Sequence, residues 1–520
     1  MACGWWSKDN ISLFVCVILL AVANAAKILL LPLQTYSGCV EMTAIGEALS
    51  CRGHNSTIFL LSNFNDRKCY GEGKVRALKF KALSGPAAPK TPEKIYDSVT
   101  DLLMNGEEAS FSTQMGVIKE MISYHCAGVV SDTRMWKHFR AEKFDMVVVE
   151  GSVFAYCYFL IPYKLRIPYV AYSTAFEDYT MAGPFLPSLV PSPFSHDTDH
   201  MSFFQRIRNL YRQLYTHITV RMAIPGSVYV SVAPELSTRS LLHLAAKSDL
   251  FLQNSDPIIG YATPRIQNHI QIGGITARPA RPLPAELKKL YDKEKSGIVI
   301  MSLGSTFKAL PMTVKHKILR TLYKLNVAVI WKYTQENDNK NVKSVKWFPQ
   351  NDLLGHVKTR LFISHCGSNS VFEALYHAVP LICFPLYGDQ FYNAARVEKW
   401  RVGLSLSLLY SSEDAMFSTL SYVLHNVTFK ANMKHASDIF KSRPETPRER
   451  AAIWIDHVMR FGGSHLRSRA QEMSVITFLG YDVFVVLLLF FISCQILLYK
   501  GFKFVQMQFL LWQSRKEKNT

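Results

Sequence analysis

Ten short apolar runs separated by longer amphipathic segments constrain the fold of this chain more than any other feature. The runs are Lys27–Leu33, Thr57–Ser62, Met146–Val149, Tyr169–Tyr172 and Asp249–Gln253 in the first half, and Ile298–Leu303, Val327–Lys332, Leu361–Ser364, Leu381–Pro385 and Gly403–Ser407 in the second. Unbroken apolar runs between helical patterns are typical of parallel strands buried on both faces. The pattern predicts an α/β protein with two doubly wound, Rossmann-like domains and ligands at the carboxyl ends of the strands.

A proline-rich stretch separates the two groups of runs. Residues 277–284 contain Pro279, Pro282 and Pro284. Proline has no backbone N–H to donate, so this stretch is unsuited to a helix or strand interior. We place the domain boundary there.

The segment 1–25 has the pattern of a secretory signal peptide. Lys8 precedes an apolar run from Ile11 to Val22, and small residues follow at Ala23 and Ala25. This order of a charged residue, an apolar run and a small-x-small site is typical of a cleaved signal. An uncleaved first membrane helix is the alternative, although the run is short for a bilayer.

A second apolar segment, 475–499, is predicted to be a transmembrane helix, because Val483–Tyr499 carries no charge. Basic residues follow it at Lys500, Lys503, Arg515, Lys516 and Lys518. The positive-inside rule therefore makes 500–520 a cytosolic tail and places the bulk of the chain in the lumen, as a single-pass type I protein. Lys516 and Lys518 resemble a dilysine retrieval signal, which indicates the endoplasmic reticulum membrane.

The net charge of +19 is distributed in a way that indicates membrane placement. Most of the excess lies in the tail, in Lys430–Ala470 and in Met201–Pro225. No nucleic-acid recognition motif is present, so we expect no nucleic-acid partner. Met201–Pro225 has apolar residues at helical spacing and several arginines. It is expected either to lie on membrane lipid or to pack on its own domain with a basic outer face.

Cysteines and sequons give weaker constraints. Seven cysteines lie between the two terminal segments, with no C-x-x-C spacing: Cys39, Cys51, Cys69, Cys126, Cys157, Cys366 and Cys383. We expect one or two disulfides of unknown connectivity and no zinc site. Asn55 and Asn426 begin glycosylation sequons.

Three segments of the second half carry the most specific pattern. They are 347–356 (Trp-Phe-Pro-Gln-Asn-Asp-Leu-Leu-Gly-His), 361–370 (Leu-Phe-Ile-Ser-His-Cys-Gly-Ser-Asn-Ser) and 385–390 (Pro-Leu-Tyr-Gly-Asp-Gln). Together they closely resemble the signature of the UDP-glycosyltransferase family, in particular its membrane-bound animal UDP-glucuronosyltransferase branch. Further resemblances lie at 52–54, 272–275, 302–305 and 452–460.

The resemblance implies a GT-B fold, in which two Rossmann-like domains face a cleft. An acceptor-binding domain would span 26–280 and a UDP-sugar-binding domain 281–440, and helices over 441–474 would return toward the first domain. The implied reaction is inverting transfer from UDP-glucuronate or UDP-glucose to a small lipophilic acceptor. It implies no metal and no further cofactor, and it allows homo- or hetero-oligomers with related transferases.

The residues themselves suit this chemistry. A strand ending at Ser364, followed by glycine and a helix starting near Asn369, points backbone N–H groups at a ligand above the strand edge, which suits phosphate. His365, Gly367, Ser368, Asn369 and Ser370 would meet the diphosphate oxygens.

The remaining donor contacts are implied by the resemblance. Trp347 would stack on uracil with Gln350 close to the nucleoside, and Glu373 would hold the ribose hydroxyls. Asp389 and Gln390 would bind hydroxyls of the donor sugar, with Gln390 typical of glucose-configured donors. Ser305 completes the predicted UDP-sugar site.

The chain departs from the family pattern at the expected catalytic dyad. Gly38 stands where the family has its catalytic histidine, and Glu150 stands at the position of the aspartate that orients it. Three explanations stay open: an acceptor that needs no base, a substitute base among Glu150, Cys39 and Glu41, or a catalytically impaired UDP-sugar-binding or regulatory homologue. If only the base is lost, Gly38→His is expected to restore activity.

Overall fold

The computed structural model describes residues 25–61, 69–70, 73–80, 90, 94–95, 97–98, 100–101, 110–173, 186–224, 226, 231–236, 238–305, 310–333, 338–339 and 341–517. All but the last residue of the predicted signal peptide, and Lys518 of the predicted retrieval signal, lie outside these residues. The chain divides into two compact units at Arg467.

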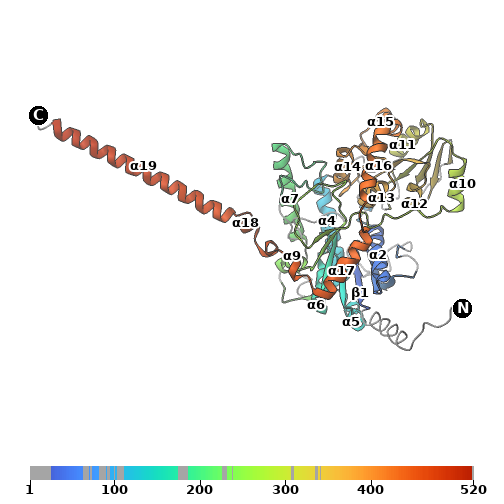
Figure 1. The fold of residues 1–520 in the computed structure, drawn as a ribbon, viewed down its shortest axis with the longest axis horizontal. Helices are drawn as coiled ribbons and strands as arrows, with labels where there is room; N and C mark the ends of the chain where they lie inside the picture. The colour runs from blue at the N-terminus through green and yellow to red at the C-terminus, as the bar shows by residue number, and fades with distance from the viewer. Residues whose placement is uncertain are drawn as a thin grey trace, which may run out of the picture. The chain divides into compact units, whose positions relative to one another are not determined.

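The first unit begins with a seven-stranded parallel sheet in the order β3-β2-β1-β4-β5-β6-β7 (Figure 1). Its strands are β1 (Lys27–Leu31), β2 (Asn55–Leu61), β3 (Arg76–Phe80), β4 (Met146–Glu150), β5 (Tyr169–Ser173), β6 (Phe251–Gln253) and β7 (His269–Gln271). The helical segments of this half are α2 (Tyr36–Cys51), α4 (Phe111–His125), the π-helical η1 (Cys126–Val130), α5 (Thr133–Glu142), the 3₁₀ turn η2 (Tyr156–Phe159), α6 (Leu160–Leu165), α7 (Phe203–Ala223) and α9 (Thr238–Ala246).

A second seven-stranded sheet has the order β10-β11-β9-β8-β12-β13-β14, parallel except for the β10–β11 pair. Its strands are β8 (Ile298–Ser302), β9 (Ala328–Lys332), β10 (Asp338–Asn339), β11 (Val342–Val345), β12 (Thr359–Ser364), β13 (Leu381–Cys383) and β14 (Gly403–Ser405). Its helices are α10 (Ala285–Lys293), α11 (Met312–Tyr323), α12 (Gln350–Leu354), α13 (Ser368–Tyr376), α14 (Gln390–Lys399), α15 (Glu413–His425) and α16 (Val427–Lys441).

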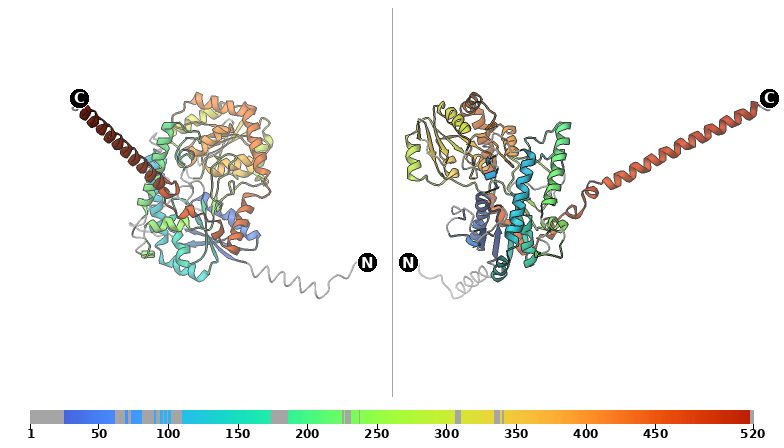
Figure 2. Two further views of the ribbon diagram at one scale, coloured as in Figure 1. Left: turned by 60° about the vertical axis from the view of Figure 1, so that its left-hand side comes forward. Right: turned by 180° about the vertical axis from the view of Figure 1, so that it is seen from behind.

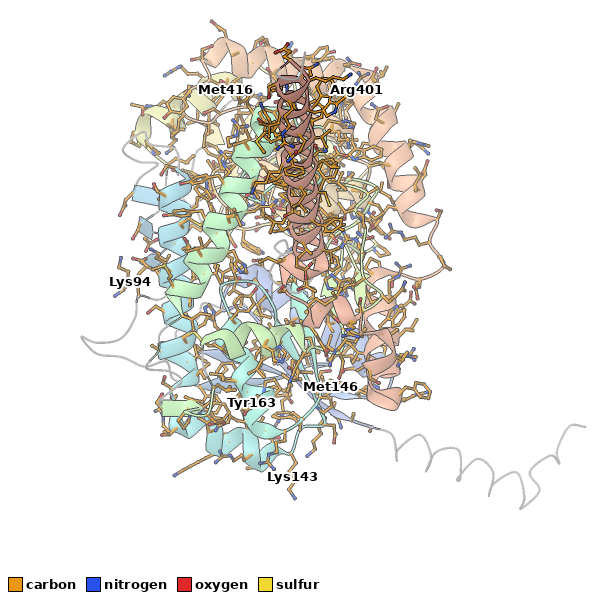
Figure 3. The ribbon with its side chains drawn as sticks, turned by 90° about the vertical axis from the view of Figure 1, so that its left-hand side faces the viewer. Lys94, Lys143, Met146, Tyr163, Arg401 and Met416 are labelled. Carbon is orange, nitrogen blue, oxygen red and sulfur yellow. A yellow bond between two sulfur atoms is a disulfide. The ribbon has the colours of Figure 1, made fainter. Side chains whose placement is uncertain are left out.

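Both sheets follow the doubly wound order, which confirms two Rossmann-like domains. Each sheet is covered on both faces by its own hydrophobic clusters. Figure 3 shows Met146 of β4, in the first sheet, and Met416 of α15, which packs on the second sheet, in opposite halves of the view. The direction in which successive strands are added reverses between β1 and β4 in one sheet and between β8 and β12 in the other. Ligands bind at such switch points.

All ten predicted strands are present, and each predicted end lies within two residues of the observed one. The fully buried strands, such as β4 and β8, are the ones that an apolar run predicts best. Four strands were not predicted: β3, β7, β10 and β11. All four are at or next to a sheet edge and alternate polar with apolar residues or are only two or three residues long, so no continuous apolar run marks them.

Helix α17 (Pro447–Phe461) leaves the second sheet and packs on α2 of the first (Figure 2). The buried Asp456 holds it there. Its carboxylate accepts hydrogen bonds from the Arg52 side chain and, at 2.6 Å, from His54 Nε2. Since His54 Nδ1 accepts the Ala26 N–H at 3.2 Å, the Nε2 atom carries the proton. Two sequence motifs that lie about four hundred residues apart thus make one structural contact.

Three disulfides are present among the described residues, where the sequence led us to expect one or two. They join Cys39 to Cys69, Cys126 to Cys157, and Cys366 to Cys383. The third follows from strand register, because Ser364 of β12 pairs with Cys383 of β13. Cys51 stays free and exposed.

The described part of the second unit contains a 3₁₀ turn, a short α-helix and one long α-helix. After η4 (Arg469–Glu472) and α18 (Val475–Phe478), α19 runs without a break from Tyr481 to Glu517. It is long and apolar enough to span a membrane, with a mean hydropathy of 2.4 over its best window. Gly480, with a positive φ of 68°, separates α18 from α19, so the long helix begins within the predicted span of 475–499 and continues through the basic tail up to Glu517.

We predict that Asp456→Ala lowers the free energy of unfolding by about 2 kcal/mol, because it leaves the His54 and Arg52 donors without their buried acceptor. The urea midpoint of the detergent-solubilised full chain, followed by tryptophan fluorescence, measures this. The control is Asp438→Ala, which breaks an exposed pair with Lys434 and is expected to leave the urea midpoint almost unchanged. Equal losses in the two variants would contradict the assigned role.

Candidate active site

The carboxyl end of β12 leads directly into a phosphate-binding geometry. The strand ends at Ser364, Cys366 adopts a left-handed φ of 58°, and Gly367 is the N-cap of α13. No side chain caps this helix. The first N–H groups of α13 therefore face the cavity with a partial positive charge and no intrahelical partner.

His365 is held between two glycines. A Cβ atom on Gly304 or on Gly367 would lie 2.8 Å or 2.7 Å from its Nε2 atom, so only glycine fits at either position. Burial, assisted by the nearby Lys332 ammonium, lowers the pKa of His365 to about 4. The imidazole is therefore neutral at pH 7 and can donate one N–H to a phosphate oxygen.

Lys332 supplies a positive charge that sequence reasoning missed. It is the last residue of β9, its Nζ donates to the Gly304 carbonyl at 2.8 Å, and it stands 4.2 Å over the Trp347 ring. The available signal was its position at the carboxyl end of a predicted strand, where ligands bind. The ammonium is thus placed on the cavity wall beside the histidine.

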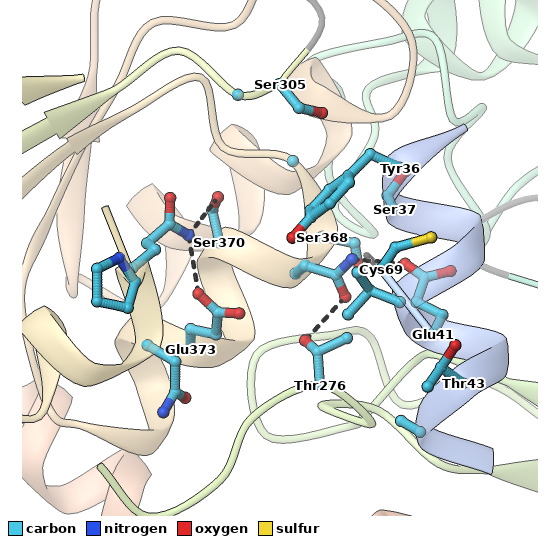
Figure 4. A pocket seen from close by; sticks show the side chains of 18 of the residues that line it. Tyr36, Ser37, Glu41, Thr43, Cys69, Thr276, Ser305, Ser368, Ser370 and Glu373 are labelled. Atoms are coloured by element: carbon cyan, nitrogen blue, oxygen red, sulfur yellow. Dashed lines mark hydrogen bonds between the residues drawn. The ribbon is translucent and has the colours of Figure 1, made fainter. Parts of the chain in front are cut away.

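The next group of side chains suits a nucleoside. Gln350 Nε2 donates to Glu373 Oε2 at 2.8 Å and to Ser370 Oγ at 3.1 Å (Figure 4). Burial raises the pKa of Glu373 to about 7. Trp347 keeps 40% of its surface exposed, and its ring system makes a T-shaped contact with the ring of Tyr36 from α2, with centroids 5.1 Å apart and an interplanar angle of 78°.

The loop before α14 brings two polar side chains to the same cavity. Gln390 Oε1 accepts the Leu386 N–H at 2.8 Å, which fixes the amide and leaves its NH₂ group as the donor for a ligand. Asp389 accepts from Asn393 at 2.7 Å, and burial raises its pKa. A fixed donor beside an acceptor can distinguish the configurations of sugar hydroxyls.

One cavity of about 530 Å³ is lined by all these groups. The structure brings all eleven predicted donor-site residues to it: Ser305, Trp347, Gln350, His365, Gly367, Ser368, Asn369, Ser370, Glu373, Asp389 and Gln390. Among the residues with described positions, no group of three or more His, Cys, Asp or Glu side chains is arranged to hold a metal ion.

The opposite wall comes from the first domain. Helix α2 contributes Tyr36, Ser37 and Glu41 to the lining. Hydrogen bonds join the two walls, among them Asn369 Nδ2 to Glu41 Oε1 at 2.6 Å and the Gly388 N–H to Gln114 Oε1 of α4 at 3.1 Å. The cavity therefore lies between the two Rossmann-like domains, within one compact unit.

The two positions expected to form the catalytic dyad do not line the cavity, unlike the predicted donor-site residues. Neither Gly38 nor Glu150 is among the lining residues. Glu150 is buried at the end of β4, and its Oε1 accepts the Ser152 N–H at 3.1 Å. A Cβ atom on Gly38 would lie 2.6 Å from the Leu33 carbonyl oxygen. The chain has therefore adapted to glycine, and Gly38→His would meet backbone rather than restore a lost base.

Comparisons with solved structures define the class of the fold. The glycotransferase of kitacinnamycin superposes with a TM-score of 0.56 at 14% identity, covering 84% of this chain and 100% of that one. The glycosyltransferase VinC, solved with DTDP, superposes with a TM-score of 0.55 at 15% identity, covering 83% and 99%. The fold is that of a GT-B glycosyltransferase.

Sequence comparisons identify the family. The family model described as "UDP-glucoronosyl and UDP-glucosyl transferase" matches residues 26–516. UDP-glucuronosyltransferase 3A1 of Bos taurus is 31% identical over 90% of this chain and 91% of its own length. UDP-glucuronosyltransferase 1-2 of Mus musculus is 30% identical over 92% and 91%, and 2-hydroxyacylsphingosine 1-beta-galactosyltransferase of Rattus norvegicus is 29% identical over 90% and 86%. The chain belongs to the UDP-glucuronosyl and UDP-glucosyl transferase family.

We predict that Lys332→Met weakens UDP binding about tenfold, because it removes a charged donor beside the diphosphate and keeps the apolar stem. Isothermal titration of the full chain in detergent with UDP, at fixed salt, measures the change. Lys289→Met, on the exposed face of α10, is the matched control and is expected to bind as the unmodified chain does. Equal affinities of the two variants would rule out a phosphate contact by Lys332.

Proposed function

We propose that this chain transfers a glucuronosyl or glucosyl group from its UDP-sugar to a small lipophilic acceptor, with inversion at the anomeric carbon. The observation that supports this best is the order of groups along one cavity. Trp347 and Glu373 suit a nucleoside, the N-terminus of α13 and His365 suit a diphosphate, and Asp389 with Gln390 suit a hexose.

The same arrangement suits departure of UDP without a metal ion. The leaving oxygen gains negative charge as the glycosidic bond breaks. The helix terminus, one neutral imidazole N–H and the Lys332 ammonium are aimed at that charge. We therefore propose a reaction that needs no metal and no cofactor besides the UDP-sugar.

The membrane location is part of the proposal. We infer that α19 anchors a single-pass type I protein of the endoplasmic reticulum, with the two domains in the lumen and the tail with Lys516 and Lys518 in the cytosol. Glycosylation at Asn55 and Asn426 accords with this. Asn55 is exposed at the start of β2, and Asn426 is partly exposed at the N-cap of α16.

Helix α7 supports contact with membrane lipid, because its amphipathicity is inverted. Its polar residues Asn209 and Gln213 are buried and donate to the Val190 carbonyl at 2.8 Å and 2.7 Å. Large apolar side chains face outward instead, among them Phe203, Phe204, Ile207, Tyr211, Leu214, Ile218 and Met222. The helix also packs on α4 of its own domain and keeps Arg206 and Arg208 exposed, as the alternative expectation describes. An apolar face with flanking arginines suits an anionic lipid surface.

A catalytically impaired UDP-sugar-binding or regulatory homologue, acting with a related transferase, is the second candidate. The observation in its favour is Gly38, where the family resemblance implies a histidine. The retained donor cavity is compatible with both candidates, so only turnover separates them.

We expect microsomes containing the full chain to form conjugates with UDP-glucuronate or UDP-glucose on a panel of phenols, amines and carboxylic acids. UDP-galactose is included because one relative is named a galactosyltransferase. Product is measured by mass spectrometry against microsomes that lack the chain. Binding of UDP without product from any donor and acceptor would favour the second candidate. Absence of UDP binding would contradict both.

A further inference from the structure

Glu41 is a buried carboxyl group with one oxygen left unpaired beside the cavity. It lies on α2, one turn beyond Gly38, and is 1% exposed. Its Oε1 accepts from Asn369, whereas its Oε2 has no partner at hydrogen-bonding geometry among the described residues. An unpaired buried carboxyl oxygen costs folding free energy, so its retention at a cavity wall indicates a ligand.

Glu41 lies beside residues that would surround the anomeric carbon of the donor sugar. Asn369, which donates to Glu41, is in the first turn of α13, where the diphosphate would sit, and Asp389 belongs to the loop proposed to bind the sugar. The anomeric carbon joins sugar to diphosphate and therefore lies between these two groups. An acceptor reaches it from the face opposite UDP, on the side of α2 and of Glu41.

Other candidates for a base are excluded by geometry. Cys39 is bonded to Cys69 and has no free thiol. Glu150 does not line the cavity, and a side chain at position 38 would collide with the Leu33 carbonyl. Glu41 alone among the open possibilities lines the cavity with a free proton acceptor.

The charges around Glu41 tune it for proton transfer. Burial raises its pKa well above the ordinary value, and Glu150 on β4 and Asp389 before α14 raise it further. Asn369 and the Tyr172 hydroxyl on β5 lower it in part. A carboxylate whose pKa is raised is a stronger base, when ionised, than an exposed glutamate.

We propose that Glu41 is the catalytic base of this chain, an inference that depends on the proposed transferase function. Its Oε2 removes the proton from the acceptor hydroxyl as the acceptor oxygen bonds to the anomeric carbon. The bond between that carbon and the β-phosphate oxygen breaks, and its electron pair leaves with UDP. The proton stays on Glu41 until the product departs. Asn369 is the positioning residue that holds the carboxylate.

The test uses the full chain in detergent with umbelliferone as a hydroxyl acceptor and benzoate as an acceptor that is already ionised. Glu41→Gln keeps the shape of the side chain and its hydrogen bond to Asn369. It is expected to lower kcat for umbelliferone about 10² to 10⁴-fold, with UDP affinity unchanged and benzoate transfer retained. Glu286→Gln, exposed in the first turn of α10, is the control and is expected to leave all three unchanged.

The pH profile gives a second readout. Only the ionised carboxylate accepts a proton, so kcat/KM of the unmodified chain is expected to fall as pH drops through the Glu41 pKa. This acid limb is expected to vanish in Glu41→Gln and to move to lower pH in Glu150→Gln, which removes a neighbouring negative charge. In Glu41→Ala, added formate is expected to restore part of the umbelliferone transfer.

Three outcomes would overturn the assignment. They are umbelliferone transfer by Glu41→Gln within a few-fold of the unmodified chain, an unchanged acid limb, or equal loss of benzoate and umbelliferone transfer. An unmodified chain that binds UDP and transfers no sugar would overturn the proposed function together with Glu41. An active unmodified chain with a fully active Glu41→Gln variant would overturn Glu41 alone.

Discussion

The hydrogen bond from Asn369 to Glu41 is the contact on which the site depends, because it joins the two domains at the place where their chemistry must meet. The Asn369 amide cannot turn freely, since its Oδ1 accepts the Thr276 hydroxyl at 3.1 Å while its Nδ2 donates to Glu41 at 2.6 Å. Thr276 directly precedes the linker at 277–284. The side-chain amide of Asn369, on α13, is therefore hydrogen-bonded both to the start of the linker at Thr276 and to helix α2 at Glu41.

The two faces of the cavity were not equally predictable from sequence. Most donor residues lie in three short segments, at strand ends or helix starts of one domain, so local pattern and family resemblance were enough to find them. Lys332 and Glu41 belong to other elements, and only the strand order and the closure of the cleft bring them to the cavity. Sequence spacing carries no information about such contacts.

The elements of the fold also divide into those that the sequence predicts and those that it does not. Buried central strands were predicted because each contains an unbroken run of apolar residues. The short strands β3, β7 and β11 lack that signal, and the disulfide from Cys366 to Cys383 needed the register of β12 on β13. Helix α7 was predicted as a helix, but which face would be buried could not be inferred, because apolar residues usually face the core. Here, Asn209 and Gln213 face it instead.

Gly38 stands where the family resemblance implies a histidine, and we propose that the Glu41 carboxyl group, one turn later, takes the part of the base. The most direct measurement is an experimental structure of the full chain with UDP and umbelliferone bound. The account predicts the diphosphate on the N-terminus of α13 beside His365 and Lys332, and Glu41 Oε2 within hydrogen-bonding distance of the umbelliferone hydroxyl. A diphosphate bound elsewhere, or a Glu41 carboxylate turned away from the acceptor, would contradict it.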